Sequence, residues 1–183
     1  RMAGLLDDLV DFARGRSGQQ LPVAVEPVPD LANALSTVVE EMQEAHPHQA
    51  IDAQIDIPGV VHCDVVRMQQ LLSNLLANAV AYGDSRQAIQ VVARTDQGTA
   101  TLCVTNQGNA IAPELMGKLF DPYWRADSAA AGASLGLGLH ICTQIAKAHP
   151  GTLQVQSSPD TGTCFTVVWP VTSRAPLPGH TPR

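Results

Sequence analysis

Between Asp64 and Tyr82, apolar residues recur every three or four positions, which is the spacing of an amphipathic α-helix. Asp64 is well placed to cap the first backbone N–H groups of that helix. The buried stripe is expected to consist of Val65, Met68, Leu71, Leu72, Leu75, Leu76 and Ala79. Such a stripe must be covered by other elements, and 183 residues with 45% hydrophobic content suffice for one ordinary α/β-sized core.

The same helix carries two carboxamides, because the stretch "LLSNLLANAV" places Asn74 and Asn78 four residues apart on one face. A buried carboxamide without a partner costs about 1–3 kcal/mol, so both side chains need hydrogen bonds. One interpretation is that they bond to neighbouring loop backbone. The other is that their oxygens converge on a ligand such as a hydrated cation with attached phosphates.

Several other segments have strand or helix patterns. We expect strands at 23–28, 51–57, 60–63, 152–158 and 163–170, a hairpin over 88–106 that turns at 96–98, and helices at 30–45, 113–120 and 137–148. Hairpin-linked strands occur at both ends of the core, so the sheet should be mixed. The sequence therefore predicts an α/β fold in which a mixed sheet packs on helices as a two-layer sandwich.

The two ends of the chain differ from this core. Residues 1–18 predict an amphipathic helix, whose apolar stripe could dock on the following domain or pair with a helix outside this chain; we favour a helical-hairpin or dimer element. Residues 171–183 are rich in proline and predict a disordered tail. No segment is long and apolar enough for a membrane span and the start does not look like a signal peptide, so a cytoplasmic location is expected.

Charge and cysteine content exclude some classes of function. The formal net charge of −6 argues against nucleic acid or anionic lipid as partners, because both need a basic face. Cys63, Cys103, Cys142 and Cys164 are far apart, form no CxxC pair and lie in apolar runs. They are expected to be reduced core thiols rather than zinc ligands or disulfides.

Two glycine-containing motifs strengthen the ligand interpretation of the asparagine pair. "VTNQGNAIAPE" leaves a strand through Asn106, Gly108 and Ala110, where small residues let a flat ligand approach the backbone. "GASLGLGLHIC" places Gly132, Gly136 and Gly138 around the start of a helix, where backbone N–H groups and the helix dipole favour phosphate. A tight turn and close helix packing would also explain the glycine-rich helix start.

The order of these motifs resembles a known family. An Asn-bearing helix, a strand ending in N-x-G, the segment "LFDPYWR", a "GLGL" helix start and a closing "GTCF" are similar to the ATP-binding catalytic domain of bacterial sensor histidine kinases, within the GHKL (HATPase_c) superfamily. The resemblance covers about Pro22 to Pro170. It implies a Bergerat-type ATP-binding domain over 19–170, preceded at 1–18 by the end of a dimerisation and phosphoacceptor helix.

The resemblance implies a role for individual residues. Asn78 is expected to be the Mg²⁺ ligand, with Asn74 on the phosphate side, and these two are the candidate catalytic residues. Asn106 corresponds to the residue that accepts from the adenine amino group, and Thr163 supports that contact. The full set expected around ATP is Asn74, Asn78, Tyr82, Asn106, Gly108, Ala110, Ile111, Phe120, Arg125, Gly136, Leu137, Gly138, Leu139 and Thr163.

Aromatic residues and local substitutions refine this expectation. Phe120, Tyr123 and Trp124 resemble the box that anchors a lid over the triphosphate. Tyr82 could line the pocket or pack in the core, and Arg125 could contact phosphate or remain a surface residue. The family usually has aspartate at the position of Asn106, although some kinases of this type use asparagine. Glycine is usual where this chain has Ala110 and Ser134, and many members have Lys or Arg at the position of Ala81.

The expected activity is ATP-dependent phosphorylation of a protein histidine. None of the six histidines has the sequence context of a phosphoacceptor, so the acceptor is expected upstream of Arg1, on a helical hairpin of a homodimeric parent kinase that signals to a response regulator. His62, His140 and His149 are expected to be ordinary packing or surface residues. Two alternatives stay open: a degenerate nucleotide-binding or scaffold module that interacts with a response regulator, and a serine kinase or hydrolase of the same superfamily.

Overall fold

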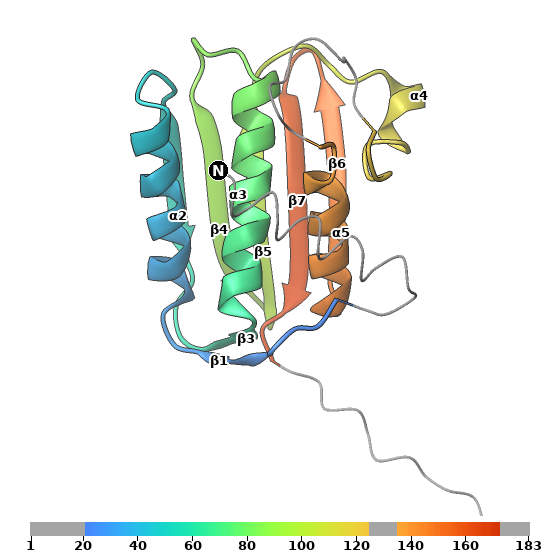
Figure 1. Cartoon of the computed structure of the whole chain (residues 1–183). Coiled ribbons are helices and arrows are strands. Elements are labelled where there is room, and N and C mark those ends of the chain that lie inside the picture. Colours follow the sequence, from blue (N-terminus) through green and yellow to red (C-terminus); the bar gives the residue numbers. More distant parts are fainter. Residues whose placement is uncertain (1–20, 125–134, 173–183) are drawn as a thin grey trace, which may run out of the picture.

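The computed structural model describes residues 21–124 and 135–172. In this part of the chain, a sheet is covered on one face by three helices, α2 (Leu31–Ala45), α3 (Val65–Tyr82) and α5 (Gly138–Ala148) (Figure 1). The arrangement confirms the predicted two-layer α/β sandwich. The helix predicted over 1–18, the loop at 127–134 and the tail from 173 onward lie outside the described residues.

The main sheet has five strands in the order β2-β4-β5-β7-β6. Their bounds are Ile51–Asp56 (β2), Ile89–Asp96 (β4), Thr99–Asn106 (β5), Gly162–Pro170 (β7) and Thr152–Ser158 (β6). Strand β2 runs parallel to β4, whereas all other neighbours are antiparallel, which confirms the predicted mixed sheet. Strands β1 (Glu26–Val28) and β3 (Val61–Cys63) form a separate antiparallel pair at one end of the molecule (Figure 1).

The hairpin between β4 and β5 fixes which residues face the helices. Its turn residues Gln97 and Gly98 have φ values of 46° and 78°, as a two-residue type I′ turn requires. Asp96 pairs with Thr99 directly across this turn, so the alternation of buried residues is set along both strands. The buried residues that share the helix-facing side are Ile89, Val91 and Ala93 on β4 and Ala100, Leu102 and Val104 on β5.

Helix α3 lies between α2 and α5 and supplies much of the core (Figure 1). The Asp64 carboxylate accepts a hydrogen bond from the Arg67 backbone N–H at 3.1 Å, which confirms the predicted N-cap. All members of the predicted stripe are buried except Val65, which is half-buried at the helix start. Each fully buried leucine of this kind contributes about 1.5–3 kcal/mol.

His149, directly after α5, has a structural role beyond ordinary packing. Its side chain is 2% exposed. The Ile145 carbonyl lies 2.8 Å from Nδ1 and can only accept, whereas the Asp64 backbone N–H lies 2.9 Å from Nε2 and can only donate. The imidazole is therefore neutral with its proton on Nδ1. This ring joins the end of α5 to the capping residue of α3.

The structure corrects three predictions. Strand β1 begins at Glu26 rather than at 23, and α4 (Pro113–Met116) ends before Gly117 instead of running to 120. Cys103 and Cys164 form a disulfide and are not separate thiols. The register explains this pairing, because Cys103 lies opposite Thr166 and Cys164 opposite Thr105, so the two cysteines are diagonal neighbours with Cα atoms 6.6 Å apart.

The remaining cysteines agree with the sequence analysis, because Cys63 and Cys142 are free and buried. Burial, together with the neighbouring Asp64 carboxylate, raises the pKa of the Cys63 thiol to about 11. This thiol is therefore protonated at neutral pH and is not a reactive nucleophile. Among the described helices, none combines the length and hydropathy needed to cross a bilayer.

Candidate functional site

Asn74 lies on the side of α3 that approaches α5. A methyl group added at Gly138, the first residue of α5, would stand 3.6 Å from Asn74 Cγ. Asn74 Nδ2 is buried and has no hydrogen-bond partner among the described residues. Asn78, one turn further along α3, is half-buried. The sequence placed these side chains on one face, and the structure brings Asn74 against the predicted glycine motif.

The start of α5 suits an anion. Leu137 occupies the N-cap position and offers no side-chain hydrogen bond to the first turn. The N–H groups at a helix start carry partial positive charge and favour phosphate oxygens. An unpaired amide N–H₂ of Asn74 beside that helix start adds another donor. The residues present therefore fit a phosphate-bearing ligand.

A second group of polar side chains lies at the end of the sheet, where β5 finishes. The register pairs Asn106 on β5 with Thr163 on β7, and Thr163 with Ser157 on β6. Asn106 and Thr163 are 5% and 6% exposed and lie on the helix-facing side of their strands. Three neighbouring strands thus place an amide and two hydroxyl groups in one row.

Hydrogen bonds link this row to the loop after β5. The hydroxyl groups of Ser157 and Thr163 lie 2.7 Å apart, and the Ile111 backbone N–H donates to Ser157 Oγ at 3.0 Å. Asn106 Nδ2 donates to the Gln107 carbonyl at the longer distance of 3.4 Å. The sequence analysis included Asn106, Ile111 and Thr163 but missed Ser157. Only the strand register, which the sequence does not give directly, places Ser157 beside Thr163.

The loops around Asn106 approach one another closely. A Cβ atom at Gly108 would lie 2.7 Å from the Tyr82 carbonyl oxygen, so glycine is required there. The Asp84 backbone N–H donates to the Gln107 carbonyl at 2.6 Å, which fastens the loop after α3 to the loop after β5. Tyr82 itself is 40% exposed, so it is not a core residue. Ala110 is exposed beside this loop.

An ion pair lies in the same loop after α3. The Arg86 guanidinium donates to both carboxylate oxygens of Asp84, at 3.0 and 2.7 Å. These hydrogen bonds, with a further bond from the Arg86 backbone N–H, lower the pKa of Asp84 to about 2. Arg86 is exposed and Asp84 is partly exposed, so the pair orders the loop locally and adds little to global stability.

The aromatic segment predicted to anchor a lid is attached to the start of α5. The Tyr123 backbone N–H donates to the Gly136 carbonyl at 3.0 Å, and Gly136 has a φ of 69°. His140 Nδ1 lies 3.0 Å from the Phe120 carbonyl and donates to it. His140, expected to be ordinary, thus connects α5 to the segment that carries Phe120. Arg125 lies outside the described residues.

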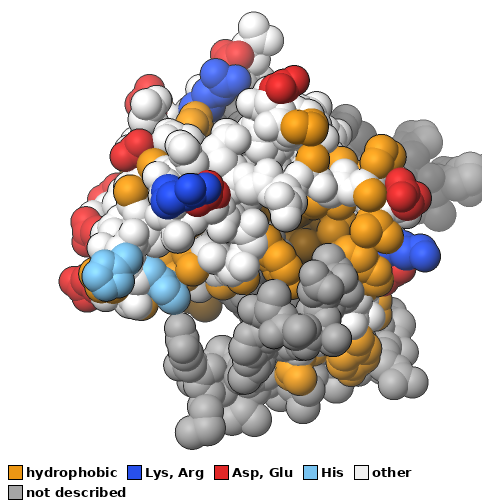
Figure 2. Space-filling model, turned by 90° about the horizontal axis from the view of Figure 1, so that it is seen from above, with side chains coloured by type: hydrophobic (Ala, Val, Ile, Leu, Met, Phe, Trp, Pro, Cys, Tyr) orange, Lys and Arg blue, Asp and Glu red, His pale blue; other side chains and the backbone are white. Residues whose placement is uncertain are grey.

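The end of the molecule that carries Asn106 is partly apolar at its surface. Seen from this end, hydrophobic side chains gather around a hollow on one side (Figure 2). Large hydrophobic residues that are exposed include Tyr82, Tyr123 and Leu135. Leu137 is buried and Leu139 half-buried at the start of α5. An apolar hollow at this end of the molecule suits the base and sugar of a nucleotide.

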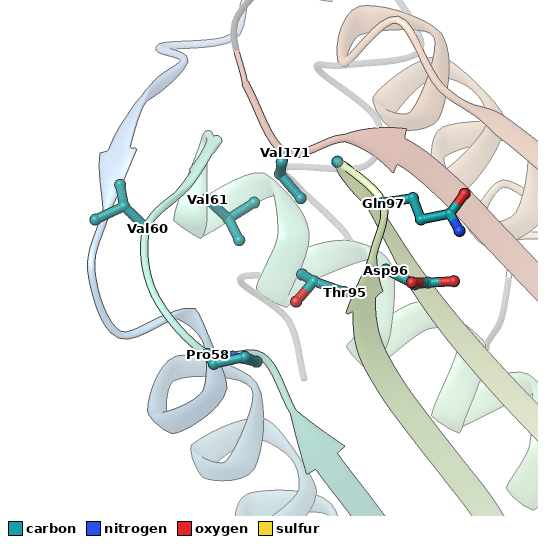
Figure 3. Close-up of a pocket in the computed structure, with 8 residues that line it drawn as sticks. Pro58, Val60, Val61, Thr95, Asp96, Gln97 and Val171 are labelled. Carbon is teal, nitrogen blue, oxygen red and sulfur yellow. The ribbon is translucent and has the colours of Figure 1, made fainter.

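A separate cavity of about 170 Å³ lies at the opposite end of the sheet, near the turn between β4 and β5 (Figure 3). Residues from several elements line it, namely Pro58, Val60, Val61, Thr95, Asp96, Gln97, Gly98 and Val171. It contains none of the predicted site residues and, among the labelled side chains, only Asp96 carries a charge. The chemistry of this cavity does not suggest a phosphate site.

Comparison with known proteins identifies the family and several relatives of this chain. The histidine kinase-, DNA gyrase B- and HSP90-like ATPase family matches residues 63–173. SenX3, a sensor-like histidine kinase of Mycobacterium tuberculosis, is 29% identical over 175 residues, covering 93% of this chain and 42% of SenX3. The sensor histidine kinase CusS of Escherichia coli is 31% identical over 173 residues, covering 93% of this chain and 35% of CusS.

A solved structure of a sensor histidine kinase has a similar fold. The solved structure of the mycobacterial sensor histidine kinase MprB matches with a TM-score of 0.65 and 25% identity, over 80% of this chain and 97% of that structure. This chain spans less than half the length of SenX3 and of CusS. The chain belongs to the histidine kinase-, DNA gyrase B- and HSP90-like ATPase family, and within that family it is an ATP-binding catalytic domain of the sensor histidine kinase type.

Proposed function

We propose that this chain is the catalytic part of a two-component sensor histidine kinase, which binds Mg²⁺·ATP and transfers the γ-phosphoryl group to a histidine on an upstream helical hairpin. The observation that carries the proposal is the buried Nδ2 of Asn74, unpaired among the described residues, against Gly138 at a helix start whose N-cap residue, Leu137, offers no side-chain hydrogen bond. A donor left without a partner is costly in a purely structural site, but it suits a site that receives phosphate oxygens.

Asn78 would hold the metal ion. Its side-chain oxygen is a hard ligand, and Mg²⁺ commonly takes only one or two protein ligands together with water and substrate phosphates. When bound, Mg²⁺ supplies neutralisation of the phosphate charge. A cluster of acidic residues is therefore not needed for this kind of site.

The base would lie at the end of the sheet. Asn106 Oδ1 would accept from the adenine amino group, supported by Thr163, while Gly108, Ala110 and Ile111 border the same loop. The triphosphate would extend from there toward Asn74 and the start of α5. Further contacts are proposed for Tyr82, Phe120, Arg125, Gly136, Leu137, Gly138 and Leu139.

The site is suited to phosphoryl transfer rather than to hydrolysis. Resemblance to hydrolytic relatives places a glutamate at the position of Asn74, where it acts as general base toward water. An amide cannot accept that proton. Asn74 would therefore orient the phosphates without activating water, and catalysis would come from positioning and charge neutralisation.

The proposal extends to the parent protein. Residues 1–18 would belong to the second helix of a dimerisation and phosphoacceptor hairpin, and residues 19–170 to the ATP-binding domain. The phosphorylated histidine would then supply a response regulator, and the parent would act as a homodimer. The net charge of −6 agrees with a partner other than nucleic acid.

The test is transfer from γ-labelled ATP in the parent kinase that contains the hairpin. We expect a label that is lost in acid and kept in base, as phosphohistidine is, and that disappears in Asn78→Ala. Asn33→Ala, which truncates an exposed asparagine on α2, is the matched control and should keep the label. An acid-stable label would favour the serine kinase alternative, and the absence of any label in the wild type would favour the scaffold alternative.

A further inference from the structure

The row formed by Asn106, Thr163 and Ser157 contains no fixed charge. All three side chains come from neighbouring positions on β5, β7 and β6. An aspartate at the place of Asn106 could only accept hydrogen bonds when ionised, whereas an amide carries both a donor and an acceptor. The row can therefore both donate hydrogen bonds to the edge of a base and accept them, whereas an ionised carboxylate can only accept.

The amide of Asn106 can present either of its two groups. Among the described residues, its Nδ2 donates only to the Gln107 carbonyl at 3.4 Å, which is beyond the usual range for an N–H···O bond. Within the described residues, no donor reaches its Oδ1. Rotation of the amide by half a turn loses this one weak hydrogen bond and places Oδ1 near the Gln107 carbonyl oxygen, at a separation of about 3.4 Å.

The hydrogen bond between the two neighbouring hydroxyl groups, of Ser157 and Thr163, can also run in either direction. Ser157 Oγ and Thr163 Oγ1 lie 2.7 Å apart, and either oxygen can be the donor. The Ile111 N–H donates to Ser157 Oγ and fixes its position, but leaves the direction of the bond between the two hydroxyls open. Thr163 can therefore donate to a ligand or accept from it.

Purine bases differ in where their edge presents hydrogen-bond donors and acceptors. Adenine presents an amino donor next to an unprotonated ring nitrogen, whereas guanine and hypoxanthine present a carbonyl acceptor next to a ring N–H donor. We propose that the base site accepts 6-oxopurine nucleotides, such as GTP and ITP, as well as ATP. This inference rests on the proposed nucleotide-binding function and makes Asn106 the residue that determines base selectivity.

Asn106→Asp provides the discriminating variant. A carboxylate at this position still accepts from the adenine amino group, but it repels the carbonyl oxygen of a 6-oxopurine and has no donor to offer. A site whose buried polar group is left unpaired by the wrong ligand can discriminate by several orders of magnitude. The substitution is therefore expected to restore selectivity for adenine.

The experiment is calorimetric titration of the chain with ADP, GDP and IDP in the presence of Mg²⁺, for the wild type and for Asn106→Asp. We expect the wild type to bind ADP and at least one of GDP and IDP with dissociation constants within about tenfold of each other, and the substitution to raise the ratio of 6-oxopurine to ADP constants at least about tenfold. Binding of both 6-oxopurines more than about tenfold weaker than that of ADP in the wild type would overturn the proposal.

An unchanged ratio in Asn106→Asp would also overturn it, because the 6-oxopurine nucleotides would then be held by their phosphates alone. The wild-type comparison decides the proposal by itself should the variant not fold, which far-ultraviolet circular dichroism checks. Failure of the wild type to bind any of the nucleotides, ADP included, would instead contradict the proposed function and with it this inference. Binding of ADP alone would contradict only the inference.

Discussion

The carboxamide of Asn74 on α3 lies against Gly138 at the first residue of α5, within 3.6 Å of the position where a methyl group would stand. Nothing among the described residues accepts from its Nδ2. This contact joins two segments that are far apart in the sequence, and it places the donor at the start of a helix whose N-cap residue, Leu137, offers no side-chain hydrogen bond.

Replacing Asn74 with alanine should weaken nucleotide binding without lowering the stability of the fold. The variant loses an unsatisfied buried donor, so its thermal midpoint without nucleotide should equal or exceed that of the wild type. With an ATP analogue at about 100 times the wild-type dissociation constant, the wild type should gain about 2.7 kcal/mol, and a variant that binds tenfold more weakly about 1.4 kcal/mol. Thermal melts with and without analogue test this. A lower midpoint with undiminished stabilisation would assign Asn74 to the core instead.

Ser157→Ala should weaken nucleotide binding although Ser157 lies outside the predicted set. It leaves the Ile111 N–H and the Thr163 hydroxyl without their partner, at a cost of about 1–3 kcal/mol in the free energy of unfolding. Ser158→Ala, at the next position, removes two hydrogen bonds, to the hydroxyl and from the backbone N–H of the exposed Thr161, and is the matched control. Chemical denaturation and nucleotide titration of both variants measure the difference. Equal behaviour of the two variants would show that the hydroxyl row is unimportant.

His149→Phe should destabilise the fold because it leaves the Asp64 N–H unpaired at the N-cap of α3 and removes the side-chain bond to the Ile145 carbonyl, which keeps only the His149 backbone N–H. The expected loss is about 1–3 kcal/mol in the free energy of unfolding. The exposed His48, replaced by alanine, serves as the control and should change stability by less than about 0.5 kcal/mol. Urea denaturation measures both. Unchanged stability in His149→Phe would contradict the assigned hydrogen bonds.

Arg86→Ala should raise the pKa of Asp84 from about 2 toward its ordinary value of 3.8, because the guanidinium no longer donates to the carboxylate. A lowered pKa in the folded state gives stability above the unfolded-state pKa that is lost as the pH falls through the folded-state value. The contribution of Asp84 should therefore disappear between about pH 4 and pH 2. Carboxyl NMR titration checks the shift, with Arg94→Ala as a control of equal charge. A pKa that stays low in Arg86→Ala would assign the shift to another cause.

The disulfide between Cys103 and Cys164 predicts the thiol count of the denatured protein. Alkylation without reductant should modify only Cys63 and Cys142, and reductant should release the other two thiols. Because the bridge closes a loop with a sequence separation of 61 residues, reduction should lower the free energy of unfolding by about 2–4 kcal/mol. Mass spectrometry of the alkylated protein gives the count. Four modified cysteines without reductant would show that the bridge is absent.

Features set by local pattern were predicted well. The bounds of α3 follow from its apolar stripe and the Asp64 cap, and β6 matches its predicted range at both ends. The β4–β5 turn follows from Asp96, Gln97 and Gly98, whose conformation suits a short hairpin. In each case the deciding interactions lie within a few residues of one another.

Features set by strand register or by contacts between distant elements could not be predicted. The Cys103–Cys164 pair, the Ser157–Thr163 hydroxyl pair and the two bonds of His149 all depend on which residues become neighbours after folding. The asparagine pair on α3 could be placed on one face, but only the folded chain brings Asn74 to Gly138. The resemblance to a kinase family, rather than periodicity, connected these positions to one site.

Calorimetric titration with a non-hydrolysable ATP analogue, with and without Mg²⁺, tests the proposed nucleotide site most directly. We expect saturable binding that Mg²⁺ strengthens in the wild type and in the Asn33→Ala control, and a loss of the Mg²⁺ effect in Asn78→Ala. Absence of binding in the wild type, or a Mg²⁺ effect that survives in Asn78→Ala, would contradict the assignment of Asn78 and Asn74 to a Mg²⁺·ATP site.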